Sequence, residues 1–390
     1  MSERVRLGVV GTGFVSRHLA LAVARTEDAV VGSVLTRRSV SGLDHPAAHL
    51  ATNDLSALLA ASDVVVECSG DPLHATEVIA AAVEACRPVV TVNAEFHVTA
   101  GSAFVDRGVV VTEAEGDQPG SEAALAEEAR GAGFRPLAYG SMKGFLEHMP
   151  SRAQVEYWSR RQGTSVPMTM AFTDGTKVQI EQALVANGLG ATIATRGLLG
   201  IEETDLKVAG PKLAEIALGV GQPVSDFVLA PGSSHGVFVV AEHDAEHRQA
   251  LQYLKMGEGP YYVLVRPSIL AHLEVMKTVR RVVHEDRGLL DNSATPVISV
   301  AAVAKRALRA GTRLERGIGS FDVRGEAVVI TDEPDHVPIG LLQGATVVRP
   351  IEAGATLSRD DVELPDSLAL RCWASIRERV LTSTVAVTPG

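Results

Sequence analysis

The chain is poor in the residues that mark a disulfide-bonded scaffold or a membrane protein. Its three cysteines, Cys68, Cys86 and Cys372, have no metal-ligand spacing, and so sparse a set suits a reducing compartment. No run approaches the roughly 18 apolar residues of a membrane span, and the start MSERVRLGVV enters a strand without the apolar segment of a signal peptide. We therefore expect a cytoplasmic protein with no membrane partner.

Positive charge is also scarce. Lys and Arg number 36 against 47 Asp and Glu, a formal net charge of -11, whereas neutralising nucleic-acid phosphates requires a basic surface. The HExxH, CxxC and EF-hand patterns do not occur. We expect a small-molecule substrate, no nucleic-acid partner and no metal, although a metal held by Glu115, Asp117 and a substrate oxygen stays an alternative.

The first third of the chain alternates short Val-rich runs with Ala-rich helical stretches. Runs that are apolar on both faces are typical of strands covered on both sides in a parallel sheet. Residues 1–140 are therefore predicted to form a Rossmann doubly wound α/β domain. The expected strands are residues 5–10, 30–35, 63–68, 88–93 and 108–113.

The first strand leads into the turn VVGTGFVSRHLA, which has the pattern of a dinucleotide-binding turn. Gly11 allows the tight turn, Gly13 lets a pyrophosphate approach the backbone, and Ser16 takes the place of the usual third glycine. A small Ser still permits close packing of helix and strand. The other residues expected to contact the cofactor are Phe14, Val15, Ser69, Gly70 and Asn93.

The second strand favours NADP over NAD as the cofactor. An enzyme that uses NAD normally has an acidic residue at its end, but here the chain reads Thr36, Arg37 and Arg38. A guanidinium at this place can hold a 2′-phosphate in a bidentate pair. The alternative is that both arginines are ordinary charges of a solvated loop.

Residues 109–122, VVVTEAEGDQPGSE, pass from a buried strand to three carboxylates, Glu113, Glu115 and Asp117. The carboxyl ends of parallel strands carry ligands, and we expect the next helix to begin at Gly120 or Ser121. Glu115 and Asp117 then have no structural task, so we expect them to face substrate and to keep Lys143 protonated as an acid or anchor.

Residues 141–290 contain possible β runs followed by Gly-rich loops with polar residues between them. They are predicted to form an α+β substrate domain with an oligomer interface, in a homodimer or homotetramer. We expect β runs at 166–172 and 176–180 with a hairpin turn at Asp174-Gly175. Lys177 and Glu181 are either an ordinary charge pair or substrate ligands. The candidate substrate-binding residues are Lys177, Glu181, Asn187, His235, Lys255 and Arg266.

The C-terminal part contains an internal repeat. After LLDNSATP, which we interpret as a linker, KRALRAGTRLE (305–315) aligns with VRPIEAGATLS (348–358), about 43 residues later. Two copies indicate a small β domain with internal pseudo-symmetry in residues 291–390. The linker and the repeat predict that this domain folds independently.

Several segments together resemble the homoserine dehydrogenase-like oxidoreductases. In the first domain these are VVVECSG, PVVTVNAEF and TEAEGDQPG, and further on YGSMKG, FTDGTKVQIEQALVANGLG and LKMGEGPYYVLVRP. The later segments resemble the subgroup with a C-terminal SAF domain, a β-clip module, one branch of which is 1-deoxy-D-xylulose 5-phosphate reductoisomerase-like. The resemblance covers nearly the whole chain and implies a nicotinamide enzyme.

One departure bears on the substrate. Homoserine dehydrogenases of this family read Thr-Ala-Asn-Lys with a catalytic lysine, where this chain has Thr91-Val92-Asn93-Ala94 followed by Glu95. Our catalytic candidates are therefore Lys143, Asp117, Glu115 and Glu95. We expect an NADP-dependent oxidoreductase that acts on a small polar hydroxy or keto substrate. The expectation includes phosphorylated substrates and a reaction in which isomerisation is coupled to hydride transfer. The alternatives are a homoserine-type alcohol dehydrogenase and a non-catalytic NADP(H) sensor.

Overall fold

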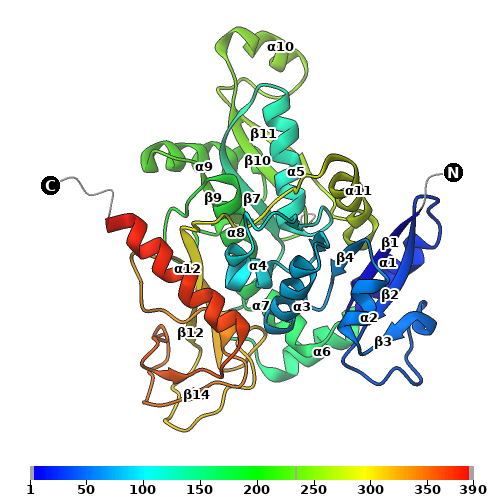
Figure 1. Ribbon diagram of the computed structural model, residues 1–390. Helices are drawn as coiled ribbons and strands as arrows, with labels where there is room; N and C mark the ends of the chain where they lie inside the picture. Colours follow the sequence, from blue (N-terminus) through cyan, green and yellow to red (C-terminus); the bar gives the residue numbers. More distant parts are fainter. Residues whose placement is uncertain (1–3, 233–234, 386–390) are drawn as a thin grey trace.

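The computed structural model describes residues 4–232 and 235–385, which form three connected parts (Figure 1). The first part is a parallel six-stranded sheet in the order β3-β2-β1-β4-β5-β6. This is the order of two mononucleotide-binding halves, in which ligands lie at the carboxyl ends of the strands. Its strands are β1 (Val5–Val10), β2 (Ala29–Leu35), β3 (Ala51–Thr52), β4 (Val64–Glu67), β5 (Val89–Thr91) and β6 (Val111–Glu113).

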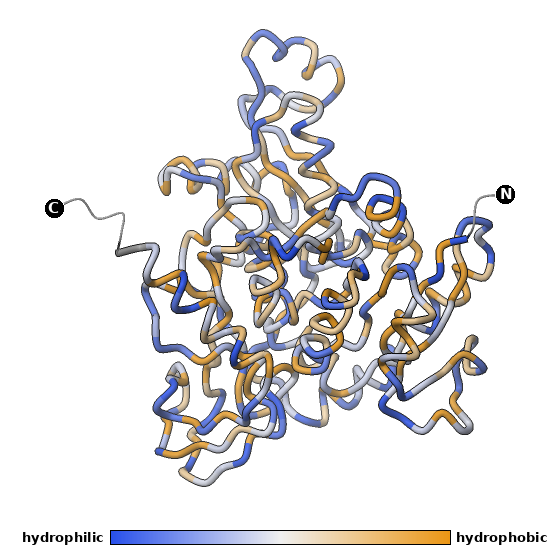
Figure 2. The backbone as a smooth tube through the Cα atoms, viewed as in Figure 1, coloured by the Kyte–Doolittle hydropathy of each residue, from blue (hydrophilic) through white to orange (hydrophobic). Residues whose placement is uncertain are grey.

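The predicted parallel sheet is confirmed, and its burial explains why these runs form strands. The valines of β4 and β5 are buried on both faces, and the strands appear as apolar segments inside the fold in Figure 2. The Asp71 side chain accepts hydrogen bonds from the backbone N–H groups of Leu73 and His74 and begins α3, with Pro72 in the first turn. The helices of this part are α1 (Phe14–Val23), α2 (Leu55–Ala60), α3 (Pro72–Glu84) and α4 (Ala94–Ala100).

The second part is a five-stranded sheet in the order β11-β10-β7-β9-β8. Alternate residues of its strands face two separate apolar clusters: Tyr139 and Val239 pack with α5 and α8, while Ala138 and Val240 pack with α9. The strands are β7 (Arg135–Lys143), β8 (Ile201–Glu202), β9 (Val224–Leu229), β10 (Val237–Glu242) and β11 (Tyr261–Arg266). The helices are α5 (Gln118–Gly131), α6 (Arg152–Gln162), α7 (Val166–Thr173), α8 (Thr176–Leu189), α9 (Leu206–Val220), α10 (Arg248–Tyr253) and α11 (Val275–Glu285).

The predicted β runs at 166–172 and 176–180 are wrong, because both segments are helical. Ser165 caps α7, with Pro167 in its first turn. The residues of α8 are buried from Thr176 to Asn187, so this helix has no exposed polar face that would have displayed a helical period. The Asp174-Gly175 turn joins the two helices, with Gly175 at φ +85°, rather than two strands.

The chain crosses between the first two parts more than once. Helix α5 follows β6 but packs on β7 and β10, and α11 returns to pack against the first sheet through Val275 and Val279. The predicted linker is not a free connection, since the Leu290 carbonyl accepts the backbone N–H of Glu113 at 2.7 Å and Asn292 is buried. Helix α11 and the segment around Leu290, which follow the second sheet in sequence, thus pack against the first sheet.

The third part confirms the internal repeat. Its two copies pair with each other at equivalent positions: Leu308 and Ile351 exchange backbone hydrogen bonds of 2.8 and 2.9 Å, and the Gly311 and Gly354 N–H groups donate to Val347 and Ala304 at 2.7 and 2.8 Å. Such reciprocal pairing defines a pseudo-twofold axis. The elements are β12 (Ile298–Ala304), β13 (Val323–Val329), β14 (Thr346–Val347), β15 (Val362–Glu363) and α12 (Leu368–Val385).

This C-terminal unit, residues 298–385, shares its core with the rest of the molecule. Val178 and Ile180 of α8 lie in the same apolar cluster as Val300 and Val323, while Trp373 of α12 packs with residues of the first part. In Figure 1, α12 extends from the C-terminal unit across to α3 and α4. A core divided in this way argues against independent folding of residues 291–390.

Candidate functional site

The dinucleotide turn has the geometry that its glycines predict. Gly11 has φ +98°, and a Cβ there would lie 3.0 Å from the Cys68 carbonyl oxygen, so only glycine suits it. A Cβ on Gly13 would meet no atom within 4 Å, which leaves this backbone open to a ligand. Ser16 is fully buried and donates to the Gly11 carbonyl at 2.7 Å, so it permits the close packing expected of a third glycine. Phe14 and Val15 open α1 beside Gly13.

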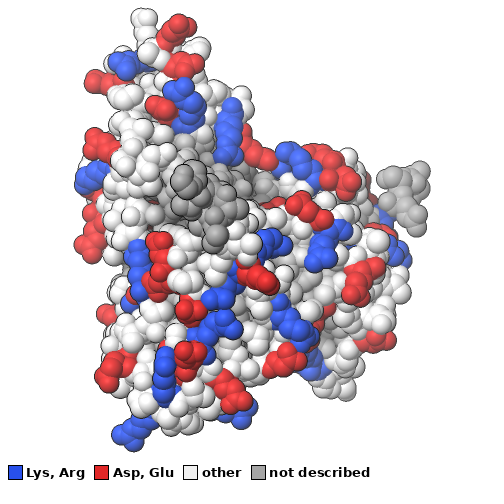
Figure 3. Space-filling view, turned by 60° about the vertical axis from the view of Figure 1, so that its left-hand side comes forward, with Lys and Arg blue, Asp and Glu red and all other residues white. Residues whose placement is uncertain are grey.

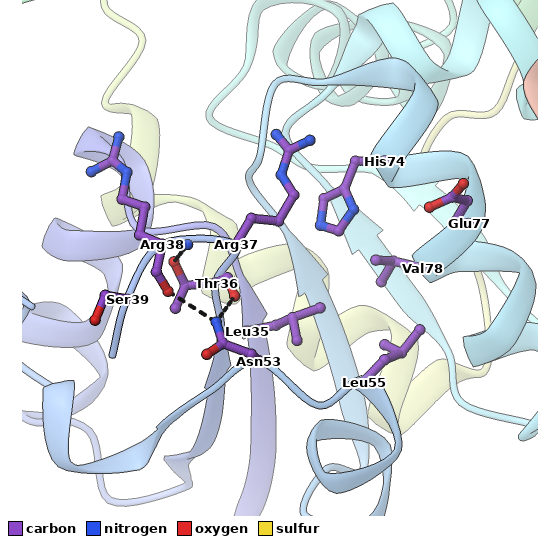
Figure 4. A pocket seen from close by; sticks show the side chains of 10 residues that line it. All are labelled: Leu35, Thr36, Arg37, Arg38, Ser39, Asn53, Leu55, His74, Glu77 and Val78. Carbon is purple, nitrogen blue, oxygen red and sulfur yellow. Dashed lines mark hydrogen bonds between the residues drawn. The ribbon is translucent and has the colours of Figure 1, made fainter. Parts of the chain in front are cut away.

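A cavity of about 520 Å³ lies beyond the end of β2, between this strand and α3 (Figure 4). It is lined by Leu35, Thr36, Arg37, Arg38, Ser39, Asn53, Leu55, His74, Glu77 and Val78. The Asn53 side-chain amide donates to the backbone carbonyls of Thr36 and Arg38 and so fixes the loop that carries the arginines. The cavity has the place and the charge needed for the adenosine end of a dinucleotide.

The two arginines of this cavity differ in their partners. Arg37 forms an ion pair with Asp71 at 2.8 Å, and its guanidinium lies beside the ring of His74 in Figure 4. Within residues 4–232 and 235–385, no carboxylate forms an ion pair with Arg38, which is exposed. Arg38 therefore has the freer guanidinium for an incoming anion.

The carboxyl ends of β4 and β5 bring polar side chains together. The Asn93 side-chain amide donates to Glu67 Oε2 at 2.7 Å, and the Ser69 backbone N–H donates to Glu67 Oε1 at 2.7 Å. Burial raises the pKa of Glu67 to about 7, although the hydrogen bonds from Ser69 and Asn93 act in the opposite direction and lower it. These hydrogen bonds hold Ser69 and Asn93 at the carboxyl edge of the sheet, and Gly70 follows at φ +65°. Contact of the three residues with a cofactor stays a prediction.

Two lysines meet three carboxylates at the junction of the first two parts. We call Glu95, Asp117, Lys143, Lys177 and Glu181 the lysine–carboxylate cluster. Lys177 Nζ lies 3.0 Å from Glu95 Oε1 and 3.7 Å from Asp117 Oδ2, and Lys143 Nζ lies 2.8 Å from Glu181 Oε2. The five side chains are only 1–16% exposed, so these charges interact strongly.

Four elements supply this cluster, and local sequence explains each position. Glu95 lies in the first turn of α4, whose Asn93 cap accepts the Phe96 N–H. Asp117 is the cap of α5, and Lys143 ends β7. Lys177 and Glu181, four residues apart on α8, lie on one helical face. They do not pair with each other, because each has a nearer partner on another element.

The protonation of the cluster follows from burial and neighbouring charge. Burial by itself would lower the pKa of Lys177, but the charges of Asp117, Glu95 and Glu181 outweigh it, and the pKa lies well above its ordinary value. Lys177 therefore keeps its positive charge near neutral pH and does not act as a base.

A second layer of buried carboxyl groups surrounds the cluster. Burial, together with the charge of Asp117, raises the pKa of Glu113 well above its ordinary value. Burial acts in the same direction on Asp117, but the charges of Lys177 and Lys143 and the hydrogen bonds from Glu113 and the Gln118 N–H together outweigh it and lower the pKa of Asp117. Glu113 therefore holds the proton and Asp117 the charge. Burial also raises the pKa of Glu122, which accepts a hydrogen bond from the Gln182 side chain at 2.7 Å.

His97 is neutral in this setting. Its Nε2 lies 3.4 Å from Glu113 Oε2, but burial lowers the pKa of His97 to about 3. The contact is thus between an uncharged imidazole and a protonated carboxyl group, and it adds no charge to the cluster.

Glu115 and Asp117 do not form the pair beside Lys143 that we expected. Glu115 binds Arg266 at 2.6 Å and Lys277 at 2.7 Å, so both Glu115 and Arg266 are used in ion pairs that tie β11 and α11 to the β6–α5 turn. The expected helix start at Gly120 or Ser121 is also wrong. Asp117 accepts the Gln118 N–H at 3.0 Å and caps α5 itself, because Pro119 fits the first helical turn.

The remaining candidates are dispersed. The Asn187 side chain binds Asn292 and the backbone of residues 297–298, so its amide is fully engaged by the protein. Lys255 follows α10 in the projecting region at the top of Figure 1. His235 is exposed, and its Nε2 would lie 3.7 Å from a Cβ on Gly144, next to Lys143.

Sequence reasoning missed several residues that the site uses. Glu67 and Glu122 were not candidates, nor was Gln118, which accepts a hydrogen bond from Lys143 Nζ. A carboxylate that ends a buried strand of a parallel sheet, as Glu67 and Glu113 do, was the available signal. Glu122 and Gln182 lie within helices and gave no such signal. Among residues 4–232 and 235–385, no group of three potential metal ligands gathers, and no helix is long and apolar enough to cross a membrane.

Comparison with known proteins agrees with an oxidoreductase. Residues 116–275 match the family model described as "Oxidoreductase DRL, catalytic domain". A comparison with curated protein sequences gives no match. The matched segment begins at the β6–α5 turn and includes Asp117, Lys143, Lys177 and Glu181. Together with the dinucleotide-binding order of the adjoining sheet, this match makes the chain an NAD(P)-dependent oxidoreductase.

Solved structures with a similar course of the chain include two dehydrogenases. One is a probable dehydrogenase from Thermotoga maritima, 13% identical, covering 73% of this chain and 90% of that chain with a TM-score of 0.41. The other is UDP-N-acetylglucosamine 3-dehydrogenase GnnA from Acidithiobacillus ferrooxidans, 14% identical, covering 74% and 92% with a TM-score of 0.42. At these values, neither likeness carries an argument about substrate.

Proposed function

We propose that this protein catalyses NADP-dependent hydride transfer between the nicotinamide and the carbonyl or hydroxyl carbon of a small polar substrate. The observation that carries the proposal is the lysine–carboxylate cluster, in which Lys143 and Lys177 meet beside the carboxyl ends of β5 and β6. In an open α/β sheet this edge is where a bound dinucleotide presents its reactive end.

The residues of the first part fit NADP(H). The open backbone at Gly13 would accept the pyrophosphate, and the cavity with Arg37 and Arg38 would hold the adenosine 2′-phosphate. Ser69 and Asn93 line the path between the turn and the cluster at the ends of β4 and β5. When bound, NADP(H) supplies or accepts the hydride.

The lysines would act on the substrate oxygen. Lys177 stays protonated because of Asp117 and Glu95, so its ammonium group stabilises the negative charge that a carbonyl oxygen gains on reduction. Lys143, which ends β7 beside His235, would be the second donor and provide the proton that this oxygen takes. In the oxidising direction Lys143, in its deprotonated form, would receive the proton of the hydroxyl group.

The finer identity of the reaction also belongs to this proposal. A coupled isomerisation, as in the reductoisomerase-like branch, requires groups that move protons before reduction, and the neutral Glu113 and Glu122 flank the two lysines. The homoserine-type alternative is less favoured, because Ala94 stands where that family has its catalytic lysine. A homodimer or homotetramer and a cytoplasmic location stay predictions.

A binding and turnover experiment tests the proposal. The parent protein should bind NADPH and oxidise it with at least one member of a panel of keto acids, ketoses and ketose phosphates, with product analysis by mass spectrometry. Lys177→Met should retain NADPH binding but lose turnover by roughly 10²–10⁴-fold. The matched control is Lys212→Met, which removes an exposed lysine on α9 and should behave like the parent. Full turnover by Lys177→Met would refute this assignment of the site.

A further inference from the structure

The helix that carries Lys177 and Glu181 has a second polar face, which contacts the C-terminal unit. Thr176 Oγ1 accepts the backbone N–H of Gly325 at 2.9 Å. Gln179 Oε1 accepts the backbone N–H of Ala327 at 2.7 Å, and its amide donates to the Gly197 carbonyl at 2.6 Å. Thr176 and Gln179 are three residues apart and so lie on one face of α8. Strand β13 is therefore attached to the helical turns that present Lys177 and Glu181.

A buried ion pair fixes the start of α8 to the same unit. Lys305 Nζ lies 2.5 Å from Asp174 Oδ2 and donates to the Ser320 carbonyl at 2.7 Å. Asp174 Oδ1 in turn accepts the backbone N–H of Thr176 at 2.9 Å. The side chains of Lys305 and Asp174 are 3% and 0% exposed, so solvent does not weaken this attachment.

The far end of α8 is held as well. Asn187 donates to Asn292 Oδ1 at 2.9 Å and to the Ile298 carbonyl at 2.8 Å, and its own side-chain oxygen accepts the N–H groups of Val297 and Ile298. The C-terminal unit and the segment that leads into it thus bind α8 at its first turn, its second turn and its end. These contacts set the rotation and the height of the helix relative to the first sheet.

We propose that the C-terminal unit is a positioning clamp, with Thr176, Gln179 and Lys305 as its positioning residues, which holds Lys177 against Glu95 and Asp117. None of the three would touch substrate. They act through α8, and a displacement of about 1 Å in a reacting group lowers turnover by as much as about 10²-fold. The importance of Lys177 for catalysis rests on the proposed function, but the clamp is testable without it.

The test measures the amine reactivity of Lys177 in the full chain. Competitive labelling with acetic anhydride, read by mass spectrometry, compares Lys177 with the exposed Lys207 and Lys212 of α9. Thr176→Val keeps the shape of the side chain but removes the acceptor of Gly325 N–H, and Gln179→Leu removes both bonds of that residue. In each variant a loosened α8 should raise Lys177 labelling several-fold, because the amine leaves its carboxylates and meets solvent.

Two controls separate positioning from general stability. Thr176→Ser keeps the hydroxyl group and should label like the parent. His336→Phe breaks the 2.8 Å bond to Ser299 beside Trp373, inside the C-terminal unit and on the side of α12, and should lower the melting temperature without raising Lys177 labelling. Parent-like labelling in Thr176→Val and Gln179→Leu, or an equal rise in His336→Phe, would overturn the clamp. Failure of NADPH binding or turnover would instead count against the proposed function.

Discussion

The dinucleotide half of the candidate site is built from loops of one sheet, whereas the lysine–carboxylate cluster is assembled from four elements. Gly11, Gly13 and Arg38 lie in short segments that directly follow β1 and β2, and Gly13 and Arg38 are exposed. The cluster takes residues from α4, α5, β7 and α8, and its side chains are almost entirely buried. One half presents backbone and charge to solvent, and the other encloses charge within protein.

This difference determines what substitution does to each half. At an exposed loop position, a new side chain changes ligand affinity and leaves most packing contacts in place. In the cluster, removal of one charge leaves its partner buried without compensation, so stability and function change together.

Lys143→Met should have the largest effect because it removes the nearest cation from Glu181, which is 1% exposed. We expect the free energy of unfolding to fall by about 3–5 kcal/mol and turnover to fall by roughly 10²–10⁴-fold. Urea unfolding and steady-state rates measure the two. Lys143→Met with Glu181→Gln should recover much of the stability but not the turnover. Recovery of both would show that the pair is structural only.

Glu67 should make stability depend on pH. Burial raises the pKa of this carboxyl group from 4.5 to about 7, so the folded state binds the proton more tightly than the unfolded chain does. The contribution of protonated Glu67 to the free energy of unfolding is therefore fully present below pH 4.5 and is lost as the pH rises to about 7. Its upper limit is about 3 kcal/mol. Urea unfolding over this range should show the decline in the parent and a flatter profile in Glu67→Gln. Identical profiles would contradict the prediction.

Gly13→Val should separate ligand binding from stability. Gly13 has φ -83° and free space around its Cβ position, so the free energy of unfolding should fall by no more than about 1 kcal/mol, because valine is a poorer N-cap of α1 than glycine. The added side chain blocks the approach of a pyrophosphate, and NADPH affinity should fall by roughly tenfold or more, equivalent to about 1.4 kcal/mol. Titration calorimetry measures the affinity. Gly11→Val is the comparison, and at φ +98° with backbone atoms close by it should lose more stability than Gly13→Val.

Arg38→Ala should give the smallest effect, confined to cofactor preference. Its guanidinium is exposed, whereas Arg37 is already paired with Asp71. We expect the preference for NADPH over NADH, measured as the ratio of the two affinities, to fall by about fivefold, or about 1 kcal/mol. The fall should be smaller in Arg37→Ala. Thermal stability should not change in either variant. An unchanged ratio in Arg38→Ala would mean that both arginines are ordinary loop charges.

Local signals predicted the first part well, because each depends on neighbouring residues. The turn after β1 needs glycine at position 11 because φ is positive there. Helix α3 begins at the Asp71-Pro72 pair, because the Asp side chain caps the first N–H groups and Pro fits the first turn. The middle part was predicted less well. Helix α8 was mistaken for a strand because burial on all sides erased the amphipathic period from which a helix is recognised.

The parallel sheet, the glycine turn after β1 and the internal repeat could be predicted from the sequence, and Lys143 and Lys177 could be named from it as candidate site residues. The packing of distant elements, which the sequence does not reveal, places Lys177 beside Glu95 and Asp117 rather than Glu181, and Glu115 beside Arg266. The same packing brings β13 and Lys305 of the C-terminal unit into contact with α8 and with Asp174 before it. The physical reason is that turns and caps are set by adjacent residues, whereas the partner of a buried charge depends on which distant elements pack together.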